Sequence, residues 1–419
     1  MLQNVKRLAF LLCAQLLLTT VTTFIIPKPH SHVASFRYQA LPFDTAFLTD
    51  PNIMSIRNAT CTIHKTLPRR RRFWKPWKLV NTSQTDFQFN YQYNEVELVK
   101  GDNAATSTAI LLIHPIGVGI GRWFYNRLLQ SLYNKRNQLE RSGRIVALAP
   151  DLLACGSASN PMVQQSCQKL PLFTVSDWSS QVEQFMAMYQ HEQCFNSSTV
   201  LWCIVSNGGC VPIALDVMPP QPFNVTNIVL SAPPRLSGLL QDNPPMKKVQ
   251  QSYRTLSGVI VGKLFWWFAL RNNGKFVQNF SETNLAADPK NLGEEWTPTC
   301  VQMARTFPKS RYSTFAFLAG ALQTSCQPAF DALANNNTED IAINVILGGD
   351  KRKNPAKSWF WEKKRKQETL KEQSLSHYLQ SRQIRGGREA VVGGRRCPAH
   401  EDSDGFADAL VSFLNMDIE

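Results

Sequence analysis

The sequence predicts an α/β protein built around a mainly parallel sheet. Short apolar runs of buried-strand length alternate with longer segments of helical spacing. The runs lie at residues 109–113, 145–149, 200–205, 228–232 and 341–347, with a short one at 390–392. Strands that alternate with helices form parallel sheets with right-handed crossovers. The 419 residues, 43% hydrophobic and 18% charged, are enough for one large domain with insertions or for two ordinary domains.

The net charge of +14 comes from two local tracts. Residues 1–78 hold twelve Lys and Arg against two Asp, and residues 351–396 hold fourteen against four Glu, so each tract contributes +10 and the remainder carries −6. The body of the protein is therefore mildly acidic, and we expect no nucleic-acid partner. No apolar run reaches the roughly 20 residues that span a bilayer, which excludes a polytopic membrane protein.

The first residues have the composition of an export signal. Lys6 and Arg7 precede an apolar stretch at 8–21, and we assign residues 1–23 to a signal peptide. Residues 24–84, rich in Lys, Arg, Ser and Thr, are assigned to a transit-peptide-like leader and linker. The pair resembles the bipartite plastid-targeting leaders of algae with secondary plastids, which implies a plastid location. Six Asn-x-Ser/Thr sequons support the alternative, the secretory pathway or an extracellular location.

The cysteines predict neither a disulfide scaffold nor a zinc site. Ten are present, nine remain once Cys13 leaves with the signal, and no Cys-x-x-Cys occurs. We expect no metal and no organic cofactor.

Residues 85–235 and 339–419 are predicted to form the two halves of the core, with a helical cap at 236–338 between them. Alternation over 86–99 predicts a hairpin-like opening. In the cap, the Phe-Trp-Trp-Phe run at 265–268 belongs either to a helix that lines a pocket or to a buried helix. A basic insertion at 351–389 holds aromatic residues among cations at 359–366. This tract is either a peripheral contact with anionic membrane lipid or a solvated helix.

A strand, a glycine-bearing turn and a helix meet at residues 200–218. This order invites comparison with a nucleophile elbow, the pattern small-x-nucleophile-x-small, in which close approach of strand and helix demands small flanking residues. The pentad 204–208 puts Ser206 at the nucleophile. Gly208 fits the pattern, while Ile204 departs from it. The alternative role for Ser206 is a helix N-cap.

Three further motifs appear in an order that extends this comparison. Residues 114–119, His-Pro-Ile-Gly-Val-Gly, follow a strand where α/β-hydrolases place His-Gly-x-Gly. Residues 150–159 resemble the Pro-Asp-x-x-Gly-x-Gly-x-Ser loop, and residues 399–402 resemble the Pro-His-Glu-Glu terminus. The chain thus resembles the α/β-hydrolase fold family with a helical cap. From about residue 90 onward it is similar to a plastid and cyanobacterial branch, whose members often show a Gln-Gly pair near the elbow without the nucleophilic Ser.

The resemblance implies a serine hydrolase acting on a carboxylic ester, or on a lipid acyl ester given the apolar cap. It assigns Ser206 as nucleophile, His400 as base and Asp350 as orienting acid. The oxyanion-hole N–H groups would come from Asn207 and from Ile116 or Gly117.

The same resemblance leaves a non-enzymatic alternative open. The family acid falls at Lys351, one residue after Asp350, which is otherwise a turn aspartate. The usual catalytic histidine aligns near Arg395 or Arg396, and His400 matches an accessory histidine. The alternative is therefore a catalytically degenerate pseudo-hydrolase that binds a small apolar ligand or a plastid partner.

Overall fold

The computed structural model describes residues 47, 49–51, 53–68, 82–101, 106–140, 143–161, 170–194, 199–217, 223–258, 261–271, 274–335, 341–349 and 374–416. Residues Phe43–Glu419 form one compact unit. The predicted signal peptide, most of the predicted leader, Asp350 and most of the basic insertion lie outside the described residues.

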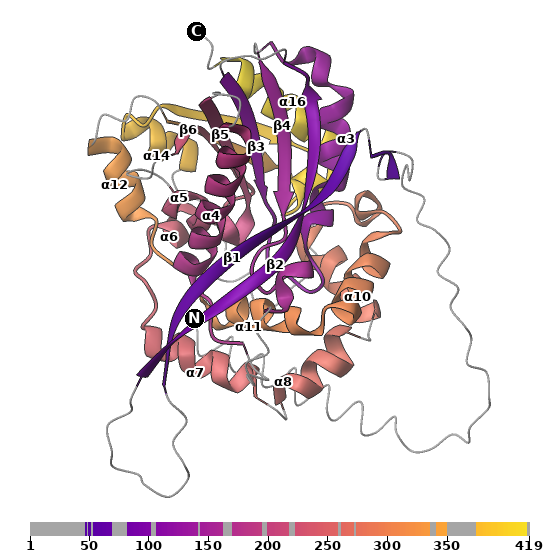
Figure 1. Ribbon diagram of the computed structural model, residues 1–419, viewed down its shortest axis with the longest axis vertical. Coiled ribbons are helices and arrows are strands. Elements are labelled where there is room, and N and C mark those ends of the chain that lie inside the picture. Colours follow the sequence, from indigo (N-terminus) through magenta and orange to yellow (C-terminus); the bar gives the residue numbers. More distant parts are fainter. Residues whose placement is uncertain are drawn as a thin grey trace, which may run out of the picture. The chain divides into compact units, whose positions relative to one another are not determined.

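Eight strands form one sheet in the order β1-β2-β4-β3-β5-β6-β7-β8 (Figure 1). β1 and β2 pair with each other antiparallel, β2 pairs antiparallel with β4, and every other neighbouring pair is parallel. The strands are β1 Met54–Pro68, β2 Thr82–Val99, β3 Thr106–Ile113, β4 Arg144–Pro150, β5 Thr199–Asn207, β6 Asn224–Ser231, β7 Ala342–Gly348 and β8 Gly386–Val392.

The six apolar runs of the sequence are confirmed as the strands β3 to β8. In β3 to β7 this continuous apolar character follows from burial on both faces, since neighbouring residues of β3 face opposite layers. Ile110 and Leu112 belong to one core cluster, whereas Leu111 and Ile113 belong to the other. The edge strand β8 is mostly not buried.

The sheet begins earlier than the sequence predicted. β1 lies within residues 24–84, which we had assigned to a leader and linker, and it pairs with β2 along its length. Its buried face consists largely of Ala59, Cys61 and Ile63. Two of these side chains are small, so the alternation of the strand is weak in hydropathy.

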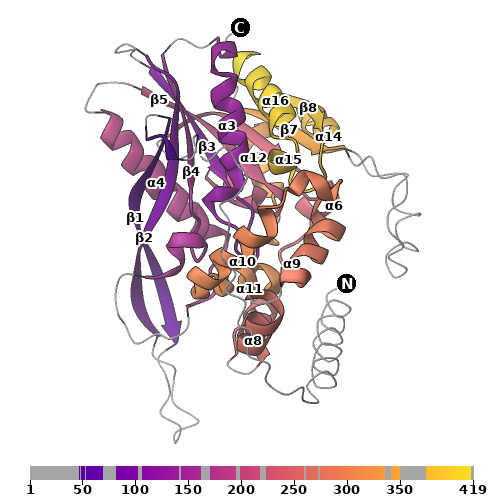
Figure 2. The ribbon, with the colours of Figure 1, turned by 90° about the vertical axis from the view of Figure 1, so that its right-hand side faces the viewer.

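Helices cover both faces of the sheet (Figure 2). α4, Val175–Cys194, and α5, Val211–Asp216, supply side chains to one core cluster. α3, Asn126–Asn134, and α16, Ser403–Asn415, supply side chains to the other. α14, Leu375–Ser381, packs beside β8.

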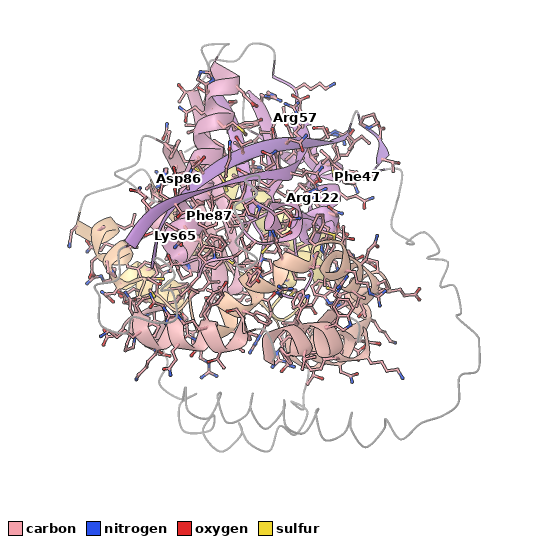
Figure 3. All side chains as sticks on the ribbon, turned by 60° about the horizontal axis from the view of Figure 1, so that its bottom comes forward. Phe47, Arg57, Lys65, Asp86, Phe87 and Arg122 are labelled. Carbon is pink, nitrogen blue, oxygen red and sulfur yellow. The ribbon has the colours of Figure 1, made fainter. Side chains whose placement is uncertain are left out.

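One ion pair attaches the β1–β2 hairpin to α4, and another joins its two strands. Lys65 on β1 pairs with Asp177 of α4, and its ammonium lies 5.9 Å from the ring centroid of Phe173. Arg57 on β1 pairs with Glu95 on β2 at 2.9 Å. Figure 3 labels Lys65 and Arg57 on this hairpin.

The described part of the cap contains helices and no strand, as predicted. In order they are α6 Leu236–Leu239, α7 Met246–Leu256, α8 Val261–Leu264, the π-helix η5 Phe265–Arg271, α9 Gly274–Phe280, η6 Ser281–Leu285, η7 Pro289–Leu292, α10 Trp296–Thr306, η8 Pro308–Ser310, α11 Arg311–Ala319 and α12 Gln327–Asn335. Among the described residues, no helix has both the length and the apolar character to cross a membrane.

The two tryptophans of the aromatic run behave differently. Trp266 is buried and packs edge-on against Phe315 of α11, with ring centroids 6.1 Å apart. Trp267 is 49% exposed. The run is therefore neither wholly a buried helix nor wholly a pocket lining.

Candidate functional site

The turn from β5 into α5 is the feature that the sequence placed at the centre of the site. Its left-handed residue is Gly208, with φ +60°, whereas Asn207 just before it is extended. Ser206 lies inside β5, paired with Ile113 on one side and Leu230 on the other. Our expectation that Ser206 stands on the turn is wrong, because the turn comes two residues later.

Ser206 is wholly buried, and its Oγ has no hydrogen-bond partner among the described residues. A hydroxyl held inside the sheet is not exposed at the end of the strand, where an elbow nucleophile stands. The residue at the nucleophile position of this turn is Gly208, flanked at ±2 by Ser206 and Cys210. This register satisfies the small-x-nucleophile-x-small pattern that Ile204 broke.

The turn leaves open space where a nucleophile side chain would project. A Cβ built on Gly208 meets no heavy atom within 4 Å. One built on Gly209 would lie 3.0 Å from the ring of Phe317, which comes from α11 in the cap. Phe317 is 40% exposed, so the ring stands between solvent and the turn.

Asn207 joins three segments at the same edge of the sheet. Its Oδ1 accepts a hydrogen bond from Ser231 Oγ at the end of β6, at 2.8 Å. Its Nδ2 donates to the carbonyl oxygen of Arg396, after β8, at 3.1 Å. Asn207 precedes the turn residue, so the N–H that follows the nucleophile position belongs to Gly209 and not to Asn207. The side chain of Asn207 instead positions the loop after β8 against the turn.

The loop after β3 packs between the turn and the cap. The carbonyl oxygen of Gly117 accepts a hydrogen bond from Thr314 Oγ1 of α11 at 3.2 Å. The backbone N–H of Ile116 faces the thiol of Cys210, where it partly offsets the burial that raises the pKa of that thiol to about 12. The N–H assigned to an oxyanion hole is thus directed at a buried sulfur.

His114 ties this loop to the one after β4. Its Nδ1–H donates to the carbonyl oxygen of Pro115 at 2.9 Å, and its Nε2 accepts from the N–H of Leu152 at 3.0 Å. The Leu152 N–H requires an acceptor, so the ring is neutral. Burial agrees with this state, because it lowers the pKa of His114.

Asp151, just after β4, binds residues from the segment after β3 and from its own loop. The carboxylate is fully buried and accepts from the backbone N–H and the guanidinium of Arg122, at 2.8 and 2.9 Å. It also accepts from the N–H and hydroxyl of Ser157, at 2.9 and 2.6 Å. Figure 3 labels Arg122. All these bonds are internal, so Asp151 holds two loops together and is committed to structure.

His400 lies on the loop after the last strand, as the sequence predicted, but in an apolar cluster. Its Nε2–H donates to the carbonyl oxygen of Leu292 in η7 at 3.0 Å. The rings of Trp123, Phe124 and Trp296 surround it, with centroids 6.0, 6.0 and 4.7 Å away. The structure does not join His400 and Ser206 by a hydrogen bond, since Ser206 Oγ has no partner.

Burial lowers the pKa of His400 from 6.5 to about 3, and the nearby charge of Arg127 acts in the same direction. The carbonyl groups of Leu292 and Phe124 oppose this shift only in part. A ring that stays neutral to such low pH is a weak base, and a serine hydroxyl needs a base with a pKa near the working pH.

Arg395 and Arg396 hold the position where the family histidine aligns. The N–H of Arg395 donates to Glu401 Oε1 at 2.8 Å, and that of Arg396 donates to the carbonyl oxygen of Leu285. Glu401 also accepts from the N–H of Ala287 at 2.6 Å. These bonds attach the loop after β8 to the cap. The candidate acid Asp350 lies outside the described residues, directly after Gly349.

Sequence reasoning missed Gly208, Gly209 and the approach of Phe317 of α11 to Gly209. The register could have been found from the small residues Ser206 and Cys210 around Gly208. The contacts of Thr314 and Phe317 had no local signal, because Thr314 reaches Gly117, 197 residues earlier, and Phe317 reaches Gly209, about a hundred residues earlier. Within the described part of the chain, no group of His, Cys, Asp and Glu could hold a metal ion.

The chain is similar to several solved structures at low sequence identity. The peroxisomal α/β-hydrolase Lpx1 of Saccharomyces cerevisiae is 13% identical, with a TM-score of 0.47, over 88% of this chain and 89% of that one. A haloalkane dehalogenase variant from Bradyrhizobium elkanii is 12% identical, with a TM-score of 0.46, over 86% and 98%. A thermophilic esterase from Thermogutta terrifontis is 10% identical, with a TM-score of 0.46, over 78% and 94%. No family model and no curated protein matches the sequence.

The chain has an α/β-hydrolase fold with a helical cap. The solved structures that it is similar to include a lipase, an esterase and two dehalogenases, and no activity is taken over from similarities this low.

Proposed function

We propose that this protein uses the α/β-hydrolase fold to bind a small apolar ligand and does not hydrolyse esters through a serine nucleophile. The observation that carries the proposal is Gly208, which holds the position where the fold exposes its nucleophile. Glycine has no side chain that could attack a carbonyl carbon. Ser206 is buried in β5, and His400 is committed to Leu292.

The space beside Gly208 supports the ligand-binding part of the proposal. Apart from Gly208 and its two chain neighbours, no heavy atom of the described residues lies within 4 Å of a Cβ built at Gly208, and the Phe317 ring borders the adjoining Gly209. Open space beside the turn with an apolar ring next to it suits a ligand with an apolar body. The proposed ligands include esters, which the protein would bind without cleaving them.

An active-site-directed fluorophosphonate tests the absence of a serine nucleophile. We expect the native protein to show no labelling at Ser206 and no hydrolysis of short-chain esters above the Ser206→Ala variant. Labelling of Ser206 that is lost in Ser206→Ala would refute the proposal.

A gain-of-function series tests the assignment of the turn. Gly208→Ser places a hydroxyl at the turn, and Arg395→His or Arg396→His supplies an imidazole where the family carries one. We expect fluorophosphonate labelling to appear at residue 208 in a combined variant and not at residue 206 in any of them. Ser206→Cys, matched in size, should stay unreactive because its thiol would be buried in β5.

Ligand binding is measured separately, by thermal shift with a panel of fatty acids and their esters. A ligand that binds only the native state raises the melting temperature with its concentration. Gly208→Leu fills the space beside the turn and should abolish the shift, whereas Val391→Leu on β8 should keep it. An unchanged shift in Gly208→Leu would place the ligand elsewhere.

We also propose that the protein is delivered to a plastid by the two-part leader. The support is the sequence alone, an apolar segment at 8–21 followed by residues 24–84, which are rich in Lys, Arg, Ser and Thr. Because β1 at Met54–Pro68 belongs to the sheet, the removable part ends before it. Amino-terminal sequencing of the native protein should find a start well after Thr23. A start at Phe24 with glycans on Asn224 would favour secretion instead.

A further inference from the structure

One end of the cap combines exposed apolar side chains with unopposed positive charge. We call it the cap face and define it by Met246, Lys247, Lys248, Leu264, Trp267 and Lys275. Each of these side chains is exposed, with Met246 at 48%, Leu264 at 45% and Trp267 at 49%. They come from α7, α8, η5 and α9, which follow one another in the chain.

The elements of the cap face pack together. α7 contacts α8, α8 contacts η5, and η5 contacts α9. Figure 1 shows α7 and α8 along the lower edge of the cap, with α11 between them and the sheet, and Figure 2 again places α8 at that end. α7 and α8, which carry four of the six residues of the cap face, therefore lie at the end of the cap away from the sheet.

The segment that carries the cap face holds charges of one sign. Residues 246–280 hold six Lys and Arg and no Asp or Glu. The helices that pack behind them behave alike, because residues 296–330 hold three Arg and Lys and no acidic residue. The acids of this part of the cap lie between these two ranges, at Glu282, Asp288, Glu294 and Glu295, outside α7, α8, η5 and α9. The elements that carry the cap face are themselves positively charged, so the cap face attracts an anionic surface.

The exposed tryptophan distinguishes a lipid surface from other anionic partners. Trp267 and Leu264 lie one helical turn apart, and the guanidinium of Arg271 stacks on the Trp267 ring, 4.3 Å from its centroid. A tryptophan with a neighbouring cation suits the boundary between acyl chains and headgroups, where the indole lies among the lipids and the cation meets phosphate.

We infer that the cap face binds the surface of an anionic lipid bilayer, with Leu264 and Trp267 entering the headgroup region and Lys247, Lys248 and Lys275 contacting lipid phosphates. This places membrane contact on the cap. The sequence had suggested the tract 359–366, which lies outside the described residues. The proposal does not depend on what occupies the space beside Gly208.

Flotation of the full chain with vesicles tests it. We expect binding to vesicles of phosphatidylcholine with phosphatidylglycerol at low salt, little binding to phosphatidylcholine alone, and release by added salt. A Lys247→Gln, Lys248→Gln, Lys275→Gln variant should bind about a hundredfold more weakly, since each cation near the surface contributes on the order of a factor of five. Absence of binding to the anionic vesicles would overturn the inference.

Two further variants locate the contact. Leu264→Ser with Trp267→Ser should lose most of the binding, while the matched control Val391→Ser with Met416→Ser, exposed side chains outside the cap, should bind like the native protein. Each variant is accepted only with an unchanged melting temperature, so that misfolding is not read as lost binding.

The basic tract outside the described residues is tested by changing Lys363, Lys364, Arg365 and Lys366 to Gln. Retained binding in this variant supports the cap face. Binding lost here and kept in both cap variants would assign the contact to the tract and refute the inference. The inference would also be refuted if brominated lipids quench the tryptophan fluorescence of the native protein and of Trp267→Phe to equal extents.

Discussion

Acidification should destabilise this protein through His400. The ring is buried among Trp123, Phe124 and Trp296, and its pKa falls from 6.5 to about 3. Below pH 6.5 the unfolded chain binds a proton at this residue, and the native chain binds it only near pH 3. Stability from this group is therefore fully present above pH 6.5 and is lost as the pH falls toward 3. The slope is about 1.4 kcal/mol per pH unit.

The variant that isolates this effect is His400→Gln. Its amide retains a donor for the carbonyl oxygen of Leu292 but takes up no proton. The free energy of unfolding of the native protein, minus that of His400→Gln, should decrease by about 3 kcal/mol as the pH falls from 6.5 to 4. Other groups that titrate in this range, His114 among them, are common to both proteins and cancel in the difference.

Urea denaturation followed by tryptophan fluorescence, at half-unit steps from pH 6.5 to pH 4, measures this difference. Phe124→Leu is the matched control, since it loosens the same aromatic cluster and keeps the imidazole. Its stability should lie below that of the native protein by a similar amount at every pH. Parallel profiles for the native protein and His400→Gln would refute the reasoning, because they would mean that His400 takes up its proton equally in both states.

Two further predictions each compare the same substitution at two positions that differ in how closely they are packed. Gly119 and Gly208 both have positive φ, but a Cβ on Gly119 would lie 1.9 Å from the Cys300 carbonyl oxygen and one on Gly208 meets nothing. In chemical denaturation, Gly208→Ala should cost about 1 kcal/mol from backbone strain alone, and Gly119→Ala at least about 2 kcal/mol more; equal costs would contradict the packing. Trp266→Ala should cost about 3–5 kcal/mol, and Trp267→Ala less than about 0.5 kcal/mol. A large loss for Trp267→Ala would show that its ring is buried.

The sequence alone determined most of the sheet. Strands covered on both faces need unbroken apolar runs, and five such runs became β3 to β7. The short run at 390–392 became part of the edge strand β8. Glycine and proline residues after these runs predicted the loops after β3 and β4 and the turn after β5. The three lie at the same edge of the sheet because β3, β4 and β5 are parallel. The alternation that predicted an opening hairpin became β2. Its partner β1 was missed, because Ala59 and Cys61 are too small to mark a buried face among polar neighbours.

The register of the turn needed the tertiary structure. Ser206 and Gly208 stand two residues apart, and either fits a strand that leads into a helix. The choice depends on where β5 stops pairing with β3 and β6, and Ser206 is still paired with both. Backbone pairing is a long-range property, so the residue that leaves the sheet with positive φ could not be chosen from local composition.

The surroundings of His400 were also decided by tertiary structure. Its place on the loop after the last strand was correctly predicted, since the order of strands fixes that loop. Its chemistry depends on Leu292 and Trp296, which the cap brings from about a hundred residues earlier in the chain. Solvent exclusion by these distant side chains, and not the identity of the residue, turns a candidate base into a buried neutral ring.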